Sequence, residues 1–143
     1  MMIVDSHLHL CDIPQVEKEL DIFFSKYDKI RQYSACTSSH SLQDWQNNCH
    51  IINKIRQKYD IDKIKICHSF GIHPQNPSVE CLEYEEFLLQ NNKISAIGEI
   101  GIDLFSEEFK KNKEQQEFIW NCQLDLALKY NKPIIERIVT FTG

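Results

Sequence analysis

Two histidines near the start of the chain have the spacing of a metal-ligand pair. Residues 4–10 read VDSHLHL, which places His7 and His9 two positions apart in an apolar, strand-like run. Residues i and i+2 of a strand point to the same face, so both imidazoles could reach one divalent ion. Taken alone, such a pair is more often two ordinary strand histidines. Asp5 shares their spacing, and we expect it to hydrogen-bond a ligand ring.

Glu99 and His73 stand where two later strands should end. Glu99 closes an apolar run between Gly98 and Gly101, where a buried carboxylate is costly unless it is paired or bound to a metal. His73 lies in the GIHP stretch, where it could bind phosphate or orient a ligand. The alternative is that both are ordinary loop residues. Glu99 would then pair with a nearby Lys or Arg, and His73 would hydrogen-bond the backbone. Asp103 could support the site or cap the segment that follows it.

The other histidines have weaker claims. His40 sits near the exit of the second predicted strand, a suitable place with no further support. His50 falls within a helical pattern, and we expect His68 to be out of phase with Phe70 in its strand. We therefore expect His7, His9, His73 and Glu99 to carry the chemistry.

The elements that must position these residues alternate between short apolar runs and longer segments of helical period. A helix beginning at Asp12 would have Pro14 in its first turn, and Ser78 would cap the third helix. The expected strands are residues 2–7, 30–37, 63–70, 93–103 and 132–141, and the expected helices follow Asp12 and Ser78 and span 41–59 and 114–130.

Strand–helix alternation of this kind predicts an α/β fold of parallel β/α units. Both an open doubly wound sheet and part of a (β/α)8 barrel fit the pattern. In either fold, functional residues gather at the carboxyl ends of the strands. His7, His9, His73 and Glu99 would then meet on one rim. The glycines Gly71, Gly98 and Gly101 indicate a tight bend or a close approach of the backbone there.

Composition limits the class of protein. The 143 residues suit one domain, and hydrophobic residues make up 42% and charged residues 26%, as in ordinary globular proteins. The formal net charge of −5 argues against a broad basic face that binds nucleic acid by charge alone. The six cysteines form no C-x-x-C pair, and neither a signal sequence nor a membrane span is evident. We expect a cytoplasmic protein with reduced cysteines and no membrane partner.

Four motifs, DSHLHL, GIHP, IGEIGID and QLDLALKYNKPII, together resemble the TatD-type metal-dependent hydrolases, which are deoxyribonuclease-like enzymes. The resemblance runs from Met2 to about Ile135. It implies a TIM-type (β/α)8 barrel that hydrolyses phosphodiester bonds of DNA. It also implies that His7 and His9 bind the first of two divalent ions (Mg²⁺, Mn²⁺ or Zn²⁺). Glu99 would be the catalytic carboxylate bridging both ions, and His73 would lie near the substrate phosphate.

The resemblance stops within the fifth strand. Arg137 stands where the family has a histidine ligand, and we expect it to repel a cation. Residues 1–135 would form roughly half of a (β/α)8 barrel, and 136–143 a divergent tail from a frameshift or truncation. Later ligands have no counterpart, so we expect little or no DNA turnover. Open sheet edges favour self-association. Two alternatives are a non-catalytic β/α fragment that needs a partner half, and an amidohydrolase-like enzyme for small esters or amides.

Overall fold

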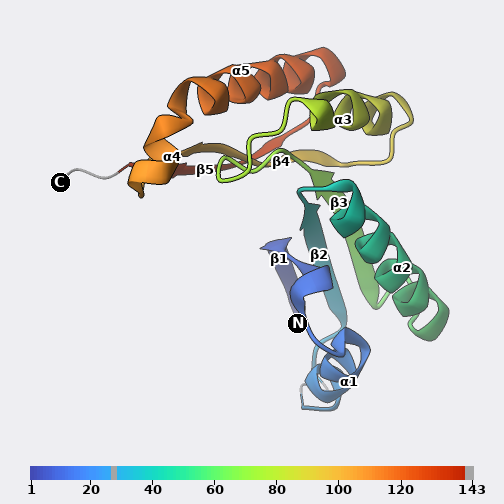
Figure 1. Ribbon diagram of the computed structural model, residues 1–143. Coiled ribbons are helices and arrows are strands. Elements are labelled where there is room, and N and C mark those ends of the chain that lie inside the picture. The colour runs from blue at the N-terminus through green and yellow to red at the C-terminus, as the bar shows by residue number, and fades with distance from the viewer. Residues whose placement is uncertain (27–28, 141–143) are drawn as a thin grey trace.

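Five parallel strands alternate with helices along the chain (Figure 1). The structure, a computed structural model, describes residues 1–26 and 29–140. Tyr27, expected on the first helix, and positions 141–143 of the expected tail lie outside these residues. The elements are β1 (Met2–Leu8), a 3₁₀ helix η1 (Leu10–Asp12), α1 (Val16–Lys26), β2 (Gln32–Ser39), α2 (Leu42–Lys58), β3 (Ile64–Phe70), α3 (Glu80–Gln90), β4 (Ala96–Asp103), α4 (Glu107–Lys111), α5 (Lys113–Tyr130) and β5 (Ile134–Val139).

The strands follow one another in the sheet in chain order, β1-β2-β3-β4-β5. A doubly wound sheet reverses its strand order and covers both faces, whereas α1 and α2 here pack on one face, against one apolar core. β3 and β4 share only two pairs of residues, Ser69 with Ala96 and Phe70 with Ile97. Figure 1 shows the sheet turning sharply at this junction. The predicted parallel β/α units are confirmed, in the barrel-like arrangement.

Two apolar cores fill the space between sheet and helices. One lies under α1 and α2 and is made by Leu10, Val16, Ala35, Ile52, Ile55, Ile64 and Ile66. The other joins the end of β3 to β4, α3 and α5 and is made by Trp45, Phe70, Leu88, Leu89, Ile94, Ile97, Ile100 and Ala127. Burial of these side chains supplies most of the driving force for folding and fixes which face of each strand points away from the helices.

Helix starts depart from the prediction in three places. The first helix begins at Val16 instead of Asp12, and Pro14 lies in the turn before it. Ser78 does not cap α3, because Val79 is the N-cap and the Ser78 carbonyl accepts the Cys81 N–H. A separate short helix, α4, precedes α5 and was not expected. It begins after Ser106, whose hydroxyl accepts the Phe109 N–H at 3.1 Å.

Both edges of the sheet expose apolar side chains. Val4 on β1 is 64% exposed and Ile138 on β5 is 55% exposed. Self-association through these edges stays a prediction. β5 runs without interruption through positions 135 and 136, where the resemblance ends. In the described part of the chain, no helix has the length and apolarity needed to cross a bilayer.

Glu85 of α3 is a carboxyl group placed inside the protein. It is fully buried, and among the described residues neither of its oxygens has a hydrogen-bond partner. Burial raises the pKa of Glu85 well above its ordinary value. The folded chain therefore holds a proton that the unfolded chain releases once the pH passes the ordinary glutamate pKa. Stability is lost as pH rises toward the folded-state pKa.

We predict that Glu85→Leu stabilises the fold by about 1–3 kcal/mol at pH 8, because it removes a buried polar group without a partner. The gain should shrink toward pH 4, where the carboxyl group is protonated in both states. Urea unfolding at several pH values measures both effects. Glu83→Leu, at an exposed position of the same helix, is the control. A stabilisation that does not change with pH would contradict this account of Glu85.

Candidate metal centre and active site

Glu99 lies at the centre of the rim where the strands end, and one of its oxygens faces three histidines. Oε2 lies 3.2 Å from His7 Nε2, 3.9 Å from His9 Nε2 and 4.0 Å from His40 Nε2. The ligand atoms of His7, His9 and Glu99 lie within 4.8 Å of one another. Two imidazole nitrogens and a carboxylate oxygen match the donor sets of zinc and manganese sites, with coordination positions left open. This arrangement fits a divalent cation.

The second oxygen of Glu99 faces two other groups. Oε1 lies 3.7 Å from His73 Nε2 and 3.7 Å from Arg137 Nη1. The neighbouring His73, with further help from His7, lowers the pKa of Glu99 to about 2, although burial opposes this. The carboxylate is therefore ionised at neutral pH. The cluster thus has a cation-binding side and a side that already carries donors and positive charge.

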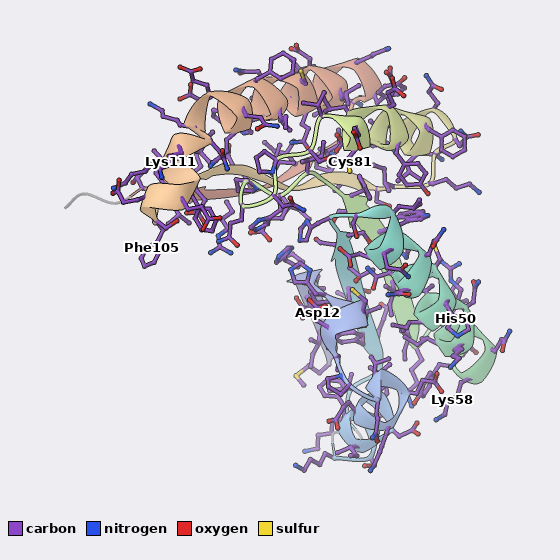
Figure 2. All side chains as sticks on the ribbon, in the orientation of Figure 1. Asp12, His50, Lys58, Cys81, Phe105 and Lys111 are labelled. Carbon is purple, nitrogen blue, oxygen red and sulfur yellow. The ribbon has the colours of Figure 1, made fainter. Side chains whose placement is uncertain are left out.

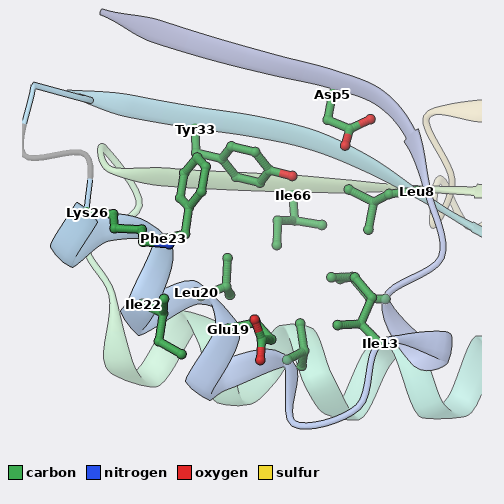
Figure 3. A pocket seen from close by; sticks show the side chains of 12 residues that line it. Asp5, Leu8, Ile13, Glu19, Leu20, Ile22, Phe23, Lys26, Tyr33 and Ile66 are labelled. Carbon is green, nitrogen blue, oxygen red and sulfur yellow. The ribbon is translucent and has the colours of Figure 1, made fainter.

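A β-bulge in β1 aims His7 and His9 at Glu99. One extra residue stands between Asp5 and Leu8 relative to β2, which interrupts the two-residue alternation of the strand. Asp5 consequently shares the helix-facing side with Leu8, and Figure 3 shows both at the cavity between α1 and the sheet. The Asp5 carboxylate accepts the His7 backbone N–H at 3.2 Å. The prediction that Asp5 supports a ligand ring is wrong, because simple alternation does not survive the bulge.

Ser38 of β2 has the supporting role expected of Asp5. Its Oγ lies 3.0 Å from His7 Nδ1 and 2.7 Å from Ser69 Oγ, and both serines are buried. When His7 donates its Nδ1 proton to Ser38, the lone pair of Nε2 remains available to a cation. This pair was not predicted from the sequence. The available signal was two serines at inward-facing positions on the strands beside His7.

His40 joins the site directly after β2. Its Nδ1 lies 3.3 Å from the Gly71 carbonyl oxygen, which can only accept a hydrogen bond. In this bond Nδ1 therefore carries the proton, and the lone pair of neutral His40 is on Nε2, on the side of Glu99. Burial, followed by the nearby charge of His73, lowers the pKa of His40, so the ring is neutral at physiological pH. The sequence analysis placed His40 at a strand exit without assigning it a role.

His73 presents the opposite tautomer. The Gln75 backbone N–H donates to His73 Nδ1 at 3.2 Å, so the proton of the neutral ring is on Nε2, facing Glu99. His73 is thus a donor on the rim and suits contact with an anion. Asp103 holds this loop, since its carboxylate accepts from the Gln75 side chain at 2.7 Å and from the Phe105 N–H at 2.9 Å. Asp103 therefore orders both the loop before the site and the segment after β4.

The glycines at the strand exits allow the close approach that the sequence indicated. A Cβ at Gly71 would lie 2.6 Å from Gly98 Cα, and a Cβ at Gly98 would lie 2.5 Å from the Ile135 carbonyl oxygen. Gly98 also has φ of +150°. The register of β4 on β5 shifts between Gly98 and Ile100, which makes Glu99 the extra residue of a second bulge. The strands that carry His7 and Glu99 are therefore both bulged at the site.

Two glutamines of α5 hold the exits of β3 and β4. Gln123 Oε1 accepts the Ile72 N–H at 2.7 Å, and Gln116 Oε1 accepts the Asp103 N–H at 2.8 Å. Both amides are buried. They replace ladder hydrogen bonds that the backbone loses where the strands end. Sequence reasoning assigned α5 only an apolar face and gave these glutamines no role.

The two remaining histidines lie outside the site. His50 is on the exposed side of α2 (Figure 2). His68 packs edge-on against Trp45, with ring centroids 4.5 Å apart, and burial lowers its pKa to about 4. Neither was expected to carry the chemistry, and neither is among the histidines that contact Glu99.

Known proteins resemble this chain in sequence and in fold. The model of the family described as TatD related DNase matches residues 4–135. A protein of Methanocaldococcus jannaschii described as an uncharacterized metal-dependent hydrolase is 32% identical over 136 residues, which cover 92% of this chain and 49% of that protein. The chain spans about half the length of this relative.

A solved structure has the same fold. The crystal structure of YJJV, a TatD homolog from Escherichia coli, superposes with a TM-score of 0.64 at 23% sequence identity. The match covers 94% of this chain and 49% of that one, which identifies the five strands as part of a TIM-type barrel. With the family model matched from residue 4 to residue 135, the chain belongs to the TatD-related family of metal-dependent hydrolases.

Proposed function

We propose that this chain binds one divalent cation through His7, His9 and Glu99 and hydrolyses phosphodiester bonds of DNA. The observation that carries the proposal is the ionised Glu99 carboxylate, with one oxygen near the Nε2 atoms of both histidines. The description of the matching family as TatD related DNase supports the choice of DNA. A bound divalent cation supplies positive charge that stabilises negative charge developing on phosphodiester oxygens.

The residues around Glu99 have separate tasks in this proposal. His73 presents an N–H at the rim and is placed to hydrogen-bond a phosphate oxygen. Arg137 adds a permanent positive charge on the same side, 45% exposed and within reach of substrate. His40, neutral because it is buried, offers Nε2 as a proton acceptor for an attacking water. The chain thus supplies a base, an anion-binding side and a cation site from adjacent strands.

Arg137 also bears on the number of cations. Its guanidinium lies 3.7 Å from Oε1, the Glu99 oxygen that would be left for a second cation when Oε2 holds the first. Two positive groups on one carboxylate oxygen repel each other, so we propose one cation per chain, where the family resemblance implies two. The positive charge of the same guanidinium also weakens the binding of the first cation, because both lie close to the Glu99 carboxylate.

Glu99→Gln should weaken Mn²⁺ or Zn²⁺ binding by at least about 10–100-fold, because it removes the anionic oxygen from the donor set. Isothermal titration calorimetry on the purified chain measures the affinity and the stoichiometry. His50→Gln, on the exposed side of α2, should leave both unchanged. Equal affinity in the wild type and Glu99→Gln would rule out this cation site.

Arg137→Gln should strengthen cation binding by about fivefold or more at low salt, because it removes a positive charge near the carboxylate. The gain should diminish as salt screens the charge. Arg31→Gln, an exposed arginine before β2, controls for net charge. The same calorimetric titration checks the prediction, and an affinity lowered by Arg137→Gln would show that Arg137 assists cation binding.

A labelled single-stranded oligonucleotide tests the reaction itself. We expect slow shortening that requires added Mn²⁺ or Mg²⁺, stops with chelator and disappears in Glu99→Gln. His40→Gln should reduce turnover more than tenfold while leaving cation affinity nearly unchanged. Parallel assays with small esters and amides test the amidohydrolase-like alternative. Cation binding without any DNA cleavage would reject the nuclease proposal and leave the metal site standing.

A further inference from the structure

Cys36 and Cys67 are partners across the β2–β3 ladder. Their neighbours Ala35 and Ile66 are packed in the core beneath α1 and α2, so both cysteines project from the opposite, inner face of the sheet. Cys67 is exposed and Cys36 is partly buried, and neither is in a disulfide. The two thiols thus lie side by side on the face that carries His7 and Ser38.

The spacing of such partners suits a covalent bond. Neighbouring strands run about 4.8 Å apart, within the roughly 4.4–6.8 Å between Cα atoms that disulfides span. Both side chains leave the same face of the sheet at paired positions, so the two thiols are neighbours, and Cys67 Sγ lies 3.5 Å from the Ala35 carbonyl oxygen beside Cys36. A bond across one ladder would be exposed to solvent and open to reduction, as labile disulfides are.

The two thiols differ in exposure and in acidity. Cys67 is exposed and the neighbouring Cys36 lowers its pKa, whereas Cys36 is partly buried, and the neighbouring Cys67 together with burial raises its pKa. Elsewhere in the chain, burial raises the pKa of Cys11 to about 11 and also raises that of Cys49. A thiolate is the attacking species in thiol–disulfide exchange, so Cys67 is the nucleophile and Cys36 the resolving thiol.

We propose that Cys36 and Cys67 form a redox-active pair that closes to a disulfide by exchange with small disulfides such as glutathione disulfide. The Cys67 thiolate attacks one sulfur of glutathione disulfide, forms a mixed disulfide and releases one glutathione thiolate. Cys36 loses its proton and attacks the Cys67 sulfur, which releases the second glutathione. Two protein thiols are oxidised, one small disulfide is reduced to two thiols, and the two protons end on glutathione.

The pair connects with the candidate metal site through hydroxyl groups. Ser38 and Ser69 follow Cys36 and Cys67 by two residues on the same ladder, their Oγ atoms lie 2.7 Å apart, and Ser38 Oγ lies 3.0 Å from His7 Nδ1. A disulfide fixes the separation of β2 and β3 immediately before these two serines and so changes the position of the hydroxyl pair that holds His7. Closing the pair should therefore lower the affinity for a divalent cation, a consequence that rests on the proposed metal site.

The pair is tested by equilibrating the intact chain in glutathione buffers of graded redox potential, followed by alkylation and peptide mass mapping. We expect a linkage between Cys36 and Cys67 that forms reversibly. Cys36→Ser should instead retain glutathione on Cys67, while Cys49→Ser should leave the linkage unchanged. Absence of the Cys36–Cys67 linkage in every buffer, or equal yields of other cysteine pairings, would overturn the proposal.

The connection to the site has its own measurement, the Mn²⁺ affinity of the reduced and the disulfide forms. We expect at least a threefold weaker affinity after oxidation, and no change on oxidising the Cys36→Ser, Cys67→Ser double variant. Equal affinities of the two wild-type forms would refute the connection. If neither form binds Mn²⁺, the proposed metal site fails, while the mass-mapped linkage still decides the redox pair.

Discussion

The structure depends on keeping one ionised carboxylate, that of Glu99, in a largely buried position. An unpaired charge there would cost several kcal/mol, so the surrounding chain must supply partners. Nitrogen atoms of five side chains do so, from the carboxyl ends of β1, β2 and β3 and from β5, and all lie within 4.0 Å of the carboxylate. Three features bring these groups together: the bulges of β1 and β4, the glycines at the strand exits, and the buried glutamines of α5.

The sequence was sufficient for the fold and for the residues that converge. Period-two and period-3.6 patterns identified the five strands and their main helices, because burial on one face imposes these periods. Histidines and a glutamate at strand exits could be expected to meet, since parallel strands of one sheet end at the same rim. The short helix α4 was missed because its five residues carry no apolar period and bury no side chain.

The fine geometry of the site was beyond the sequence. Strict alternation assigned Asp5 to the face of His7, and a one-residue bulge reversed that assignment. His40 had no motif to mark it, and its importance comes from contact with the Gly71 carbonyl, 31 residues later in the chain. Ser38 and Ser69 likewise become a unit only when two strands pair. Such long-range contacts between polar groups leave no periodic signal in the sequence.

The junction between β3 and β4 has a consequence for how the molecule holds together. Only two residue pairs join the strands there, and of the two apolar cores only the one that contains Phe70 and Ile97 crosses the junction. His7 and His9 come from the first part of the sheet and Glu99 from the second. A cation held by all three would link the two parts of the sheet across this junction, so its binding free energy would also stabilise the fold. A divalent cation at the rim would therefore stabilise the structure as well as take part in the reaction.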